Sequence, residues 1–82
     1  MKNVLVTGGC GFIGSNFVKL LVNNNEVFPV VLDKLTYAGN LSNLDHIDKN
    51  EYIFSEGDIC DKALIDSLFK KYKFIAVFHF AA

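Results

Sequence analysis

The sequence lacks the features that mark membrane, secreted and nucleic-acid-binding proteins. Its N-terminus, Met1-Lys2-Asn3, leads directly into a short apolar run with no leader-like segment, and no apolar stretch approaches the length of a membrane span. Eight basic residues balance nine acidic ones, so we expect no basic surface for nucleic acid or for an anionic membrane. These absences predict a cytoplasmic protein whose partner is a small molecule, with no nucleic acid and no membrane involved.

Paired cysteines and nucleotide-hydrolase motifs are missing as well. Cys10 and Cys60 stand far apart without the spacing of a zinc or redox motif, so we expect two reduced thiols and no metal. No lysine directly follows Gly14, which excludes the phosphate loop of nucleoside-triphosphate hydrolases. His79 is isolated in an apolar run, and we interpret it as a core histidine rather than as an acid, a base or a ligand.

What is present is a glycine-rich segment, TGGCGFIG at residues 7–14, between an apolar run and a helical pattern. In a dinucleotide-binding turn, glycines allow a sharp turn, the approach of backbone to a pyrophosphate and close packing of the following helix. N–H groups at the start of that helix then face the anion. Two registers fit, Gly9-x-Gly11-x-x-Gly14 and Gly8-x-x-Gly11-x-x-Gly14, and spacing alone does not choose between them.

The 82 residues, 51% of them hydrophobic, suit one small packed α/β domain. We expect strands at 4–6, 28–32, 52–54 and 74–80, helices after the glycine segment and after Asp61, and one short helix within the loop 34–50. The first helix has apolar positions at helical spacing: Phe12, Ile13, Phe17, Leu20 and Leu21. The predicted fold is a doubly wound parallel sheet of Rossmann type, in the order 3-2-1-4 and truncated after the fourth strand.

Asp33 ends the second expected strand, about 20 residues beyond Gly14, where an acidic side chain meets the adenosine ribose of a dinucleotide. A carboxylate accepts hydrogen bonds from ribose hydroxyls and repels a 2′-phosphate, which predicts NAD rather than NADP as the cofactor. Lys34 beside it weakens that preference. Ala81 and Ala82 end the fourth strand, next to the first, where the nicotinamide half requires backbone to come close; plain strand-end alanines are an equal alternative.

Four segments together resemble the extended short-chain dehydrogenase/reductase family, and within it the enzymes that dehydrate nucleotide sugars. They are TGGCGFIGSNF (7–17), LDKLTYAGNLSNL (32–44), GDICD (57–61) and HFAA (79–82), which extend over the whole chain. The resemblance implies a homodimeric lyase that converts dTDP-glucose to the 4-keto-6-deoxy sugar and water, with NAD as a transient hydride acceptor.

The resemblance also implies which residues contact the cofactor. The backbone of Phe12 and Ile13 would face the pyrophosphate, in the glycine register Gly8, Gly11 and Gly14. Asp33, Lys34, Leu35 and Thr36 would surround the ribose with Tyr37, Ala38, Gly39 and Asn40 nearby, Asp58 and Ile59 would bracket the adenine, and Phe80, Ala81 and Ala82 would pass toward the nicotinamide.

The catalytic groups of that family do not occur in residues 1–82. None of the three tyrosines is followed four positions later by lysine, as the family's Tyr-x-x-x-Lys pair requires, and the adjacent Asp-Glu pair is missing. We therefore expect residues 1–82 to be the N-terminal, cofactor-binding part of a longer enzyme, inactive alone. Two alternatives stay open: a free-standing, non-catalytic dinucleotide-binding module, and another family member such as a nucleotide-sugar 4-epimerase.

Overall fold

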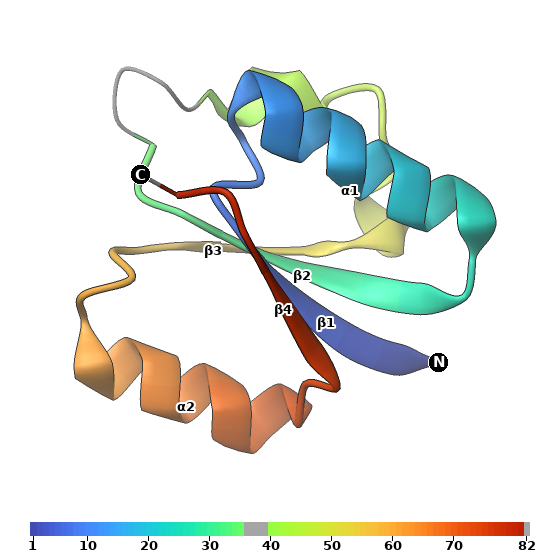
Figure 1. Ribbon diagram of the computed structural model, residues 1–82. Coiled ribbons are helices and arrows are strands. Elements are labelled where there is room, and N and C mark those ends of the chain that lie inside the picture. Colours follow the sequence, from blue (N-terminus) through green and yellow to red (C-terminus); the bar gives the residue numbers. More distant parts are fainter. Residues whose placement is uncertain (36–39, 82) are drawn as a thin grey trace.

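A computed structural model describes residues 1–35 and 40–81 of the chain. In chain order the elements are β1 (Lys2–Thr7), α1 (Phe12–Asn24), β2 (Val27–Asp33), the 3-10 helices η1 (Leu41–Leu44) and η2 (Lys49–Glu51), β3 (Ile53–Glu56), α2 (Lys62–Tyr72) and β4 (Ala76–His79). The strands are parallel and lie in the order β3-β2-β1-β4. Helix α1 covers one face of the sheet and α2 the other (Figure 1). The predicted fold class is confirmed.

Alternate residues of β1 enter two separate cores, one on each face of the sheet. Val4 and Val6 pack beneath α1 with Val18. Leu5 points to the opposite face and packs with Leu68 of α2. All five side chains are at most 7% exposed. Burying one such side chain contributes about 1.5–3 kcal/mol, so the two cores hold both helices against the sheet.

Pro29 lies inside β2 without breaking the sheet. It is in register with Val4 of β1, whereas pairing with β3 begins one residue later, at Val30. Because proline has no N–H group, it is tolerated where a strand needs no donor toward its neighbour. The ladder between β2 and β3 therefore starts immediately after the proline.

Two strands differ from their expected ranges. β3 is shifted toward the C-terminus and begins at Ile53, because Tyr52 instead ends η2 and is buried in the core beneath α1. β4 is shorter than expected, since only Ala76–His79 pair with β1. The error at β3 arises because Tyr52 packs into a core next to the strand without joining the ladder. At β4 the flanking residues Ile75 and Phe80 are 57% and 39% exposed, and each donates a single backbone hydrogen bond to β1.

The apolar face expected for α1 is wrong at several positions. Phe12, Ile13 and Leu20 are 80%, 69% and 53% exposed. The residues that α1 buries are Gly14, Ser15 and Val18. A Cβ atom on Gly14 would overlap the carbonyl of Gly8, so only a very small residue lets the first turn of the helix approach the glycine segment. Close approach of the backbone, rather than apolar periodicity, therefore sets the buried face there.

Local residue types account for both the start and the end of the helices, and the helix expected after Asp61 is confirmed. The side chain of Asp61 caps α2 by accepting a hydrogen bond from the N–H of Leu64 at 3.1 Å. Asn25 ends α1 in the left-handed conformation, with φ 56°. Lys70 and Lys71 lie in the last turn of α2, where they oppose the negative end of the helix dipole.

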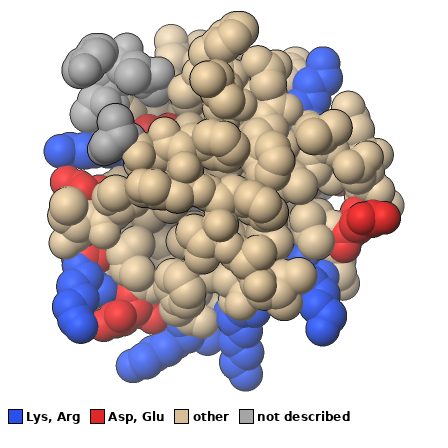
Figure 2. Space-filling view, viewed as in Figure 1, with Lys and Arg blue, Asp and Glu red and all other residues tan. Residues whose placement is uncertain are grey.

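The face of the molecule over β4 is largely uncharged, with lysines along the edge that α2 forms (Figure 2). Ile75 and Val77 contribute apolar side chains that are 57% and 47% exposed. Across residues 1–35 and 40–81, no helix combines the length and apolar character needed to cross a membrane.

Candidate functional site

Gly8 makes the turn at the carboxyl end of β1. Its φ is +72°, in the region that L side chains rarely adopt, and its N–H donates to the carbonyl of Leu32 at 2.8 Å. A Cβ atom at this position would lie 2.6 Å from the backbone nitrogen of Ala81. Two constraints therefore demand glycine here: the backbone angle and the close approach of the chain that follows β4.

Gly9 is constrained by a different neighbour. A Cβ atom on Gly9 would lie 2.6 Å from a methyl carbon of Val31, beneath α1. Gly8 and Gly9 are thus both required by packing, which explains why both glycine registers fit the sequence. The choice of register for a bound pyrophosphate stays a prediction.

The N-terminus of α1 has no side-chain cap. Gly11 occupies the capping position in extended conformation, with φ −74° and ψ 172°, and supplies no side-chain acceptor. The first N–H groups of a helix have no partner within it, and here they belong to residues that include Phe12 and Ile13, whose side chains are exposed. α2, by contrast, is capped by Asp61. The start of α1 can accept an anion through its backbone.

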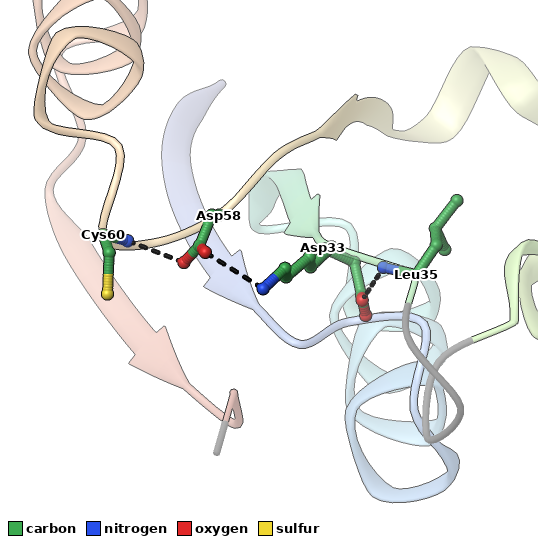
Figure 3. Close-up of polar contacts among 5 residues, drawn as sticks. Asp33, Leu35, Asp58 and Cys60 are labelled. Atoms are coloured by element: carbon green, nitrogen blue, oxygen red, sulfur yellow. Dashed lines mark hydrogen bonds and ion pairs between the residues drawn. The ribbon is translucent and has the colours of Figure 1, made fainter.

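Asp33 joins the end of β2 to the glycine turn. Its Oδ2 accepts a hydrogen bond from the N–H of Cys10 at 2.8 Å, and its Oδ1 accepts one from the N–H of Leu35 at the same distance. Figure 3 shows the bond to Leu35, a residue with a left-handed φ of 58°. The side chain is only 9% exposed, and each oxygen retains a lone pair for a further donor. The carboxylate is held rigidly beside the uncapped helix.

Cys10 organises the turn through its backbone, which the sequence did not reveal. Its N–H binds Asp33, and its carbonyl accepts hydrogen bonds from the N–H of Asn40 at 3.1 Å and from the side chain of Asn43 at 2.8 Å. Burial, and secondarily the charge of Asp33, raises the pKa of the Cys10 thiol to about 12, so the thiol stays protonated. The bonds to Asn40 and Asn43 anchor the segment that begins η1.

Lys34 and Asp58 form an ion pair across the ends of β2 and β3. Their Nζ and Oδ2 atoms are 3.2 Å apart. Oδ1 of Asp58 accepts a hydrogen bond from the N–H of Cys60 at 2.9 Å, and both contacts are drawn in Figure 3. The N–H of Cys60, followed by Lys34, lowers the pKa of Asp58. Ile59 next to it is half-buried against the core beneath α2.

The segment after β4 passes directly over the glycine turn. The N–H of Phe80 donates to the carbonyl of Thr7 at 2.8 Å, and the backbone of Phe80 and Ala81 faces Gly8. The Phe80 ring packs on Phe17 of α1, with 5.2 Å between ring centroids. The predicted site residues that the structure describes therefore lie at one edge of the sheet, some at the ends of β1, β2 and β3 and others directly after β4. Thr36, Tyr37, Ala38, Gly39 and Ala82 lie outside the described residues.

His79 is not the core histidine that we expected. Its side chain is exposed, because α2 covers β1, β2 and β3 and leaves this face of β4 open. Its Nδ1 and Oγ1 of Thr7 form a hydrogen bond of 2.6 Å between two residues in register on neighbouring strands. His79 is therefore hydrogen-bonded at the rim of the sheet rather than packed in the interior.

A hollow of about 420 Å³ lies away from these residues, at the C-terminal half of α1. Its lining is Lys19, Val22, Asn23, Asn25, His46, Ile47, Asp48 and Glu51. It contains none of the predicted site residues. The candidate site is instead the edge of the sheet where the uncapped start of α1 lies beside the carboxylate of Asp33. Among the described residues, no three side chains of His, Cys, Asp or Glu lie close enough to hold a metal ion.

Comparison with known proteins gives consistent matches along the chain. Residues 5–82 match the family model described as GDP-mannose 4,6 dehydratase. The chain is 47% identical to dTDP-glucose 4,6-dehydratase of Haemophilus influenzae, over 100% of this chain and 25% of that protein. It thus spans about a quarter of the length of the curated relatives that it matches.

Solved structures agree with this match. The crystal structure of dTDP-glucose 4,6-dehydratase from Bacillus anthracis in complex with NAD has a TM-score of 0.94 and 39% identity, over 100% of this chain and 27% of that one. UDP-glucose 4-epimerase from Thermotoga maritima, solved with UDP-glucose, has a TM-score of 0.85 and 36% identity, over 98% of this chain and 24% of that one.

Proposed function

The chain belongs to the family described as GDP-mannose 4,6 dehydratase, and from that premise we propose that residues 1–82 are the N-terminal part of an NAD-binding domain. The observation that carries the proposal is the position of Asp33. Its fixed, almost buried carboxylate lies beside the uncapped start of α1, so an acceptor for ribose hydroxyls and a row of N–H donors for a pyrophosphate lie at one edge of the sheet.

The residues present fit a dinucleotide. In the proposed mode, Gly8, Gly11 and Gly14 let backbone approach the pyrophosphate, while Phe12 and Ile13 donate their N–H groups to it. Asp33 accepts hydrogen bonds from the ribose hydroxyls and so orients the adenosine half of the cofactor. Asp58 and Ile59 flank the adenine. Phe80 and Ala81 line the way toward the nicotinamide. When bound, NAD supplies reversible hydride acceptance; the described residues bind and orient it.

For the whole enzyme we propose the dehydration of dTDP-glucose to dTDP-4-keto-6-deoxyglucose and water, in a cytoplasmic homodimer. Identity of 47% and 52% to named dTDP-glucose 4,6-dehydratases over nearly the whole chain supports this substrate. Residues 1–82 contain no Tyr-x-x-x-Lys pair, so we assign them cofactor binding and no catalytic group. A 4-epimerase is the second candidate, because such an enzyme has a TM-score of 0.85 to this chain.

The test uses the full-length polypeptide that carries residues 1–82, incubated with dTDP-glucose and, separately, with UDP-glucose. Mass spectrometry detects the loss of one water from dTDP-glucose, whereas epimerisation leaves the mass of UDP-glucose unchanged and alters its proton NMR spectrum. We expect dehydration of dTDP-glucose. Epimerisation alone would identify the second candidate, and NAD binding without conversion of either sugar would identify a non-catalytic module.

A further inference from the structure

The Lys34–Asp58 ion pair lies next to the residue that we propose for ribose binding. Lys34 immediately follows Asp33, and its Nζ lies 3.2 Å from Oδ2 of Asp58. The two side chains are 62% and 41% exposed, so a bound ligand could reach either group. The pair therefore places one positive and two negative side chains, including that of Asp33, around the same end of the sheet.

Backbone hydrogen bonds hold the two aspartates in place, whereas an ion pair with Asp58 holds the lysine. Both oxygens of Asp33 accept backbone hydrogen bonds. Asp58 accepts one from the N–H of Cys60, and this bond, followed by Lys34, lowers the pKa of its carboxyl group. Asp58 is thus a fixed anion. Among the described residues, the Lys34 ammonium group makes its one polar contact with Asp58.

The charges of Asp33, Lys34 and Asp58 together determine whether a 2′-phosphate is attracted or repelled. NADP differs from NAD by a phosphate on the adenosine ribose. In the proposed function, this phosphate replaces the hydroxyl from which Asp33 would accept a hydrogen bond. The carboxylate of Asp33 repels that phosphate, and a free Lys34 ammonium one residue away would attract it. A second carboxylate bound to the ammonium opposes the attraction.

We propose that Asp58 is a specificity-determining residue, which binds the Lys34 ammonium and thereby prevents it from recruiting the 2′-phosphate of NADP. The inference rests on the proposed function, since it requires the adenosine ribose to lie at Asp33. It assigns the Lys34–Asp58 pair to cofactor discrimination, whereas a contribution to stability is small for an ion pair this exposed.

The test is a titration of the full-length polypeptide with NAD and with NADP, in Asp58→Asn and in the wild type, at the same low salt concentration. Asparagine keeps a side-chain oxygen for the N–H of Cys60, so the local turn survives while the charge is removed. We expect the ratio of NADP to NAD affinity to rise about fivefold, the factor that a unit charge about 4 Å away produces in water-like surroundings. The rise should shrink at high salt.

A second substitution separates the role of Lys34 from a direct effect of Asp58. Lys34→Gln should lower the affinity for NADP about fivefold in the Asp58→Asn background and much less in the wild type, because in the wild type Asp58 binds the ammonium and keeps it from turning toward the phosphate. Equal effects in both backgrounds would show that Asp58 does not restrain Lys34, and would overturn the inference. Because the Lys34 side chain is exposed, we expect the Lys34→Gln variant to fold like the wild type.

Asp66→Asn is the matched control. Asp66 is an exposed carboxylate that pairs with Lys62 at 4.0 Å within α2, and it should leave the nucleotide ratio unchanged. An unchanged ratio in Asp58→Asn, in a wild-type protein that binds NAD, would overturn this inference alone. Failure of the wild type to bind either nucleotide would overturn the proposed function and this inference with it.

Discussion

At the scale of single residues, Gly8 is the position where two independent demands coincide. Its φ of +72° costs a non-glycine residue about 1–2 kcal/mol, and a Cβ atom would also meet the backbone at Ala81. We expect Gly8→Ala to lower the free energy of unfolding by about 3 kcal/mol, measured by urea denaturation followed by circular dichroism.

Gly57→Ala is the control for that substitution. At Gly57 the added methyl group would meet the side chain of Leu64, which can rotate away, and no left-handed φ is involved. A loss of about 1 kcal/mol is expected. Equal losses for the two variants would contradict the account of Gly8.

The two cysteines should differ in reactivity. Burial keeps the pKa of Cys10 near 12, well above its ordinary value of 9.0, whereas Cys60 is exposed. Because the thiolate is the reactive species, iodoacetamide at pH 8 should modify Cys60 in the native protein and Cys10 only after unfolding. Peptide mapping by mass spectrometry reads out both sites. Rapid native alkylation of Cys10 would show that the glycine turn opens readily.

The same pKa shift has a consequence for stability. The folded-state pKa of Cys10 lies above the unfolded value, so its contribution to stability is fully present below about pH 9 and is lost as the pH rises toward 12. Above pH 9 the unfolded chain releases a proton that the folded chain retains. The contribution is therefore constant under physiological conditions.

At the scale of elements, the end of α2 is suboptimal. Lys73 ends the helix with a left-handed φ of 51°, a conformation that glycine adopts without strain. We expect Lys73→Gly to raise the free energy of unfolding by about 1 kcal/mol in urea denaturation. Lys70→Gly, the same substitution within the last helical turn, should lower it by about 1 kcal/mol. Changes of the same sign in both variants would contradict this reading of the helix end.

Helices and strands could be predicted from the sequence where nearby residue types determine where they begin and end. The aspartate cap of α2, the asparagine end of α1 and the β-α-β order follow from residue types and spacing. The buried face of α1 did not, because it depends on how closely Gly14 approaches the backbone of Gly8, a contact between two turns of the chain. The limits of β4 depend likewise on which residues find partners in β1.

The candidate site likewise has features that the sequence predicts and features that it does not. The spacing between Gly14 and Asp33 predicted an acid at the end of β2 beside the glycine turn, and the structure places it there. The bonds of that acid to backbone N–H groups and the anchoring of Cys10 by Asn43 could not be predicted, since backbone donors leave no trace in a side-chain pattern. The Lys34–Asp58 pair joins two loops whose distance in sequence says nothing of their proximity.

At the scale of the whole molecule, the sheet gathers the ends of β1, β2, β3 and β4 at one edge, and the predicted contacts of the cofactor that the structure describes lie along it. The helices on the two faces supply the cores that hold this edge in place. The sequence of residues 1–82 contains neither a Tyr-x-x-x-Lys pair nor an adjacent Asp-Glu pair. Under the proposed function, we therefore expect substitutions along this edge to act through NAD affinity.

The most direct measurement is isothermal titration of NAD into the full-length polypeptide and its Asp33→Ala variant, with Asp66→Asn as an acidic residue outside the site and circular dichroism to verify folding. Removing hydrogen bonds to a charged acceptor should weaken NAD binding by at least about tenfold in Asp33→Ala, while Asp66→Asn matches the wild type. Unchanged NAD affinity in a folded Asp33→Ala protein would contradict the assignment of this edge of the sheet as the adenosine site.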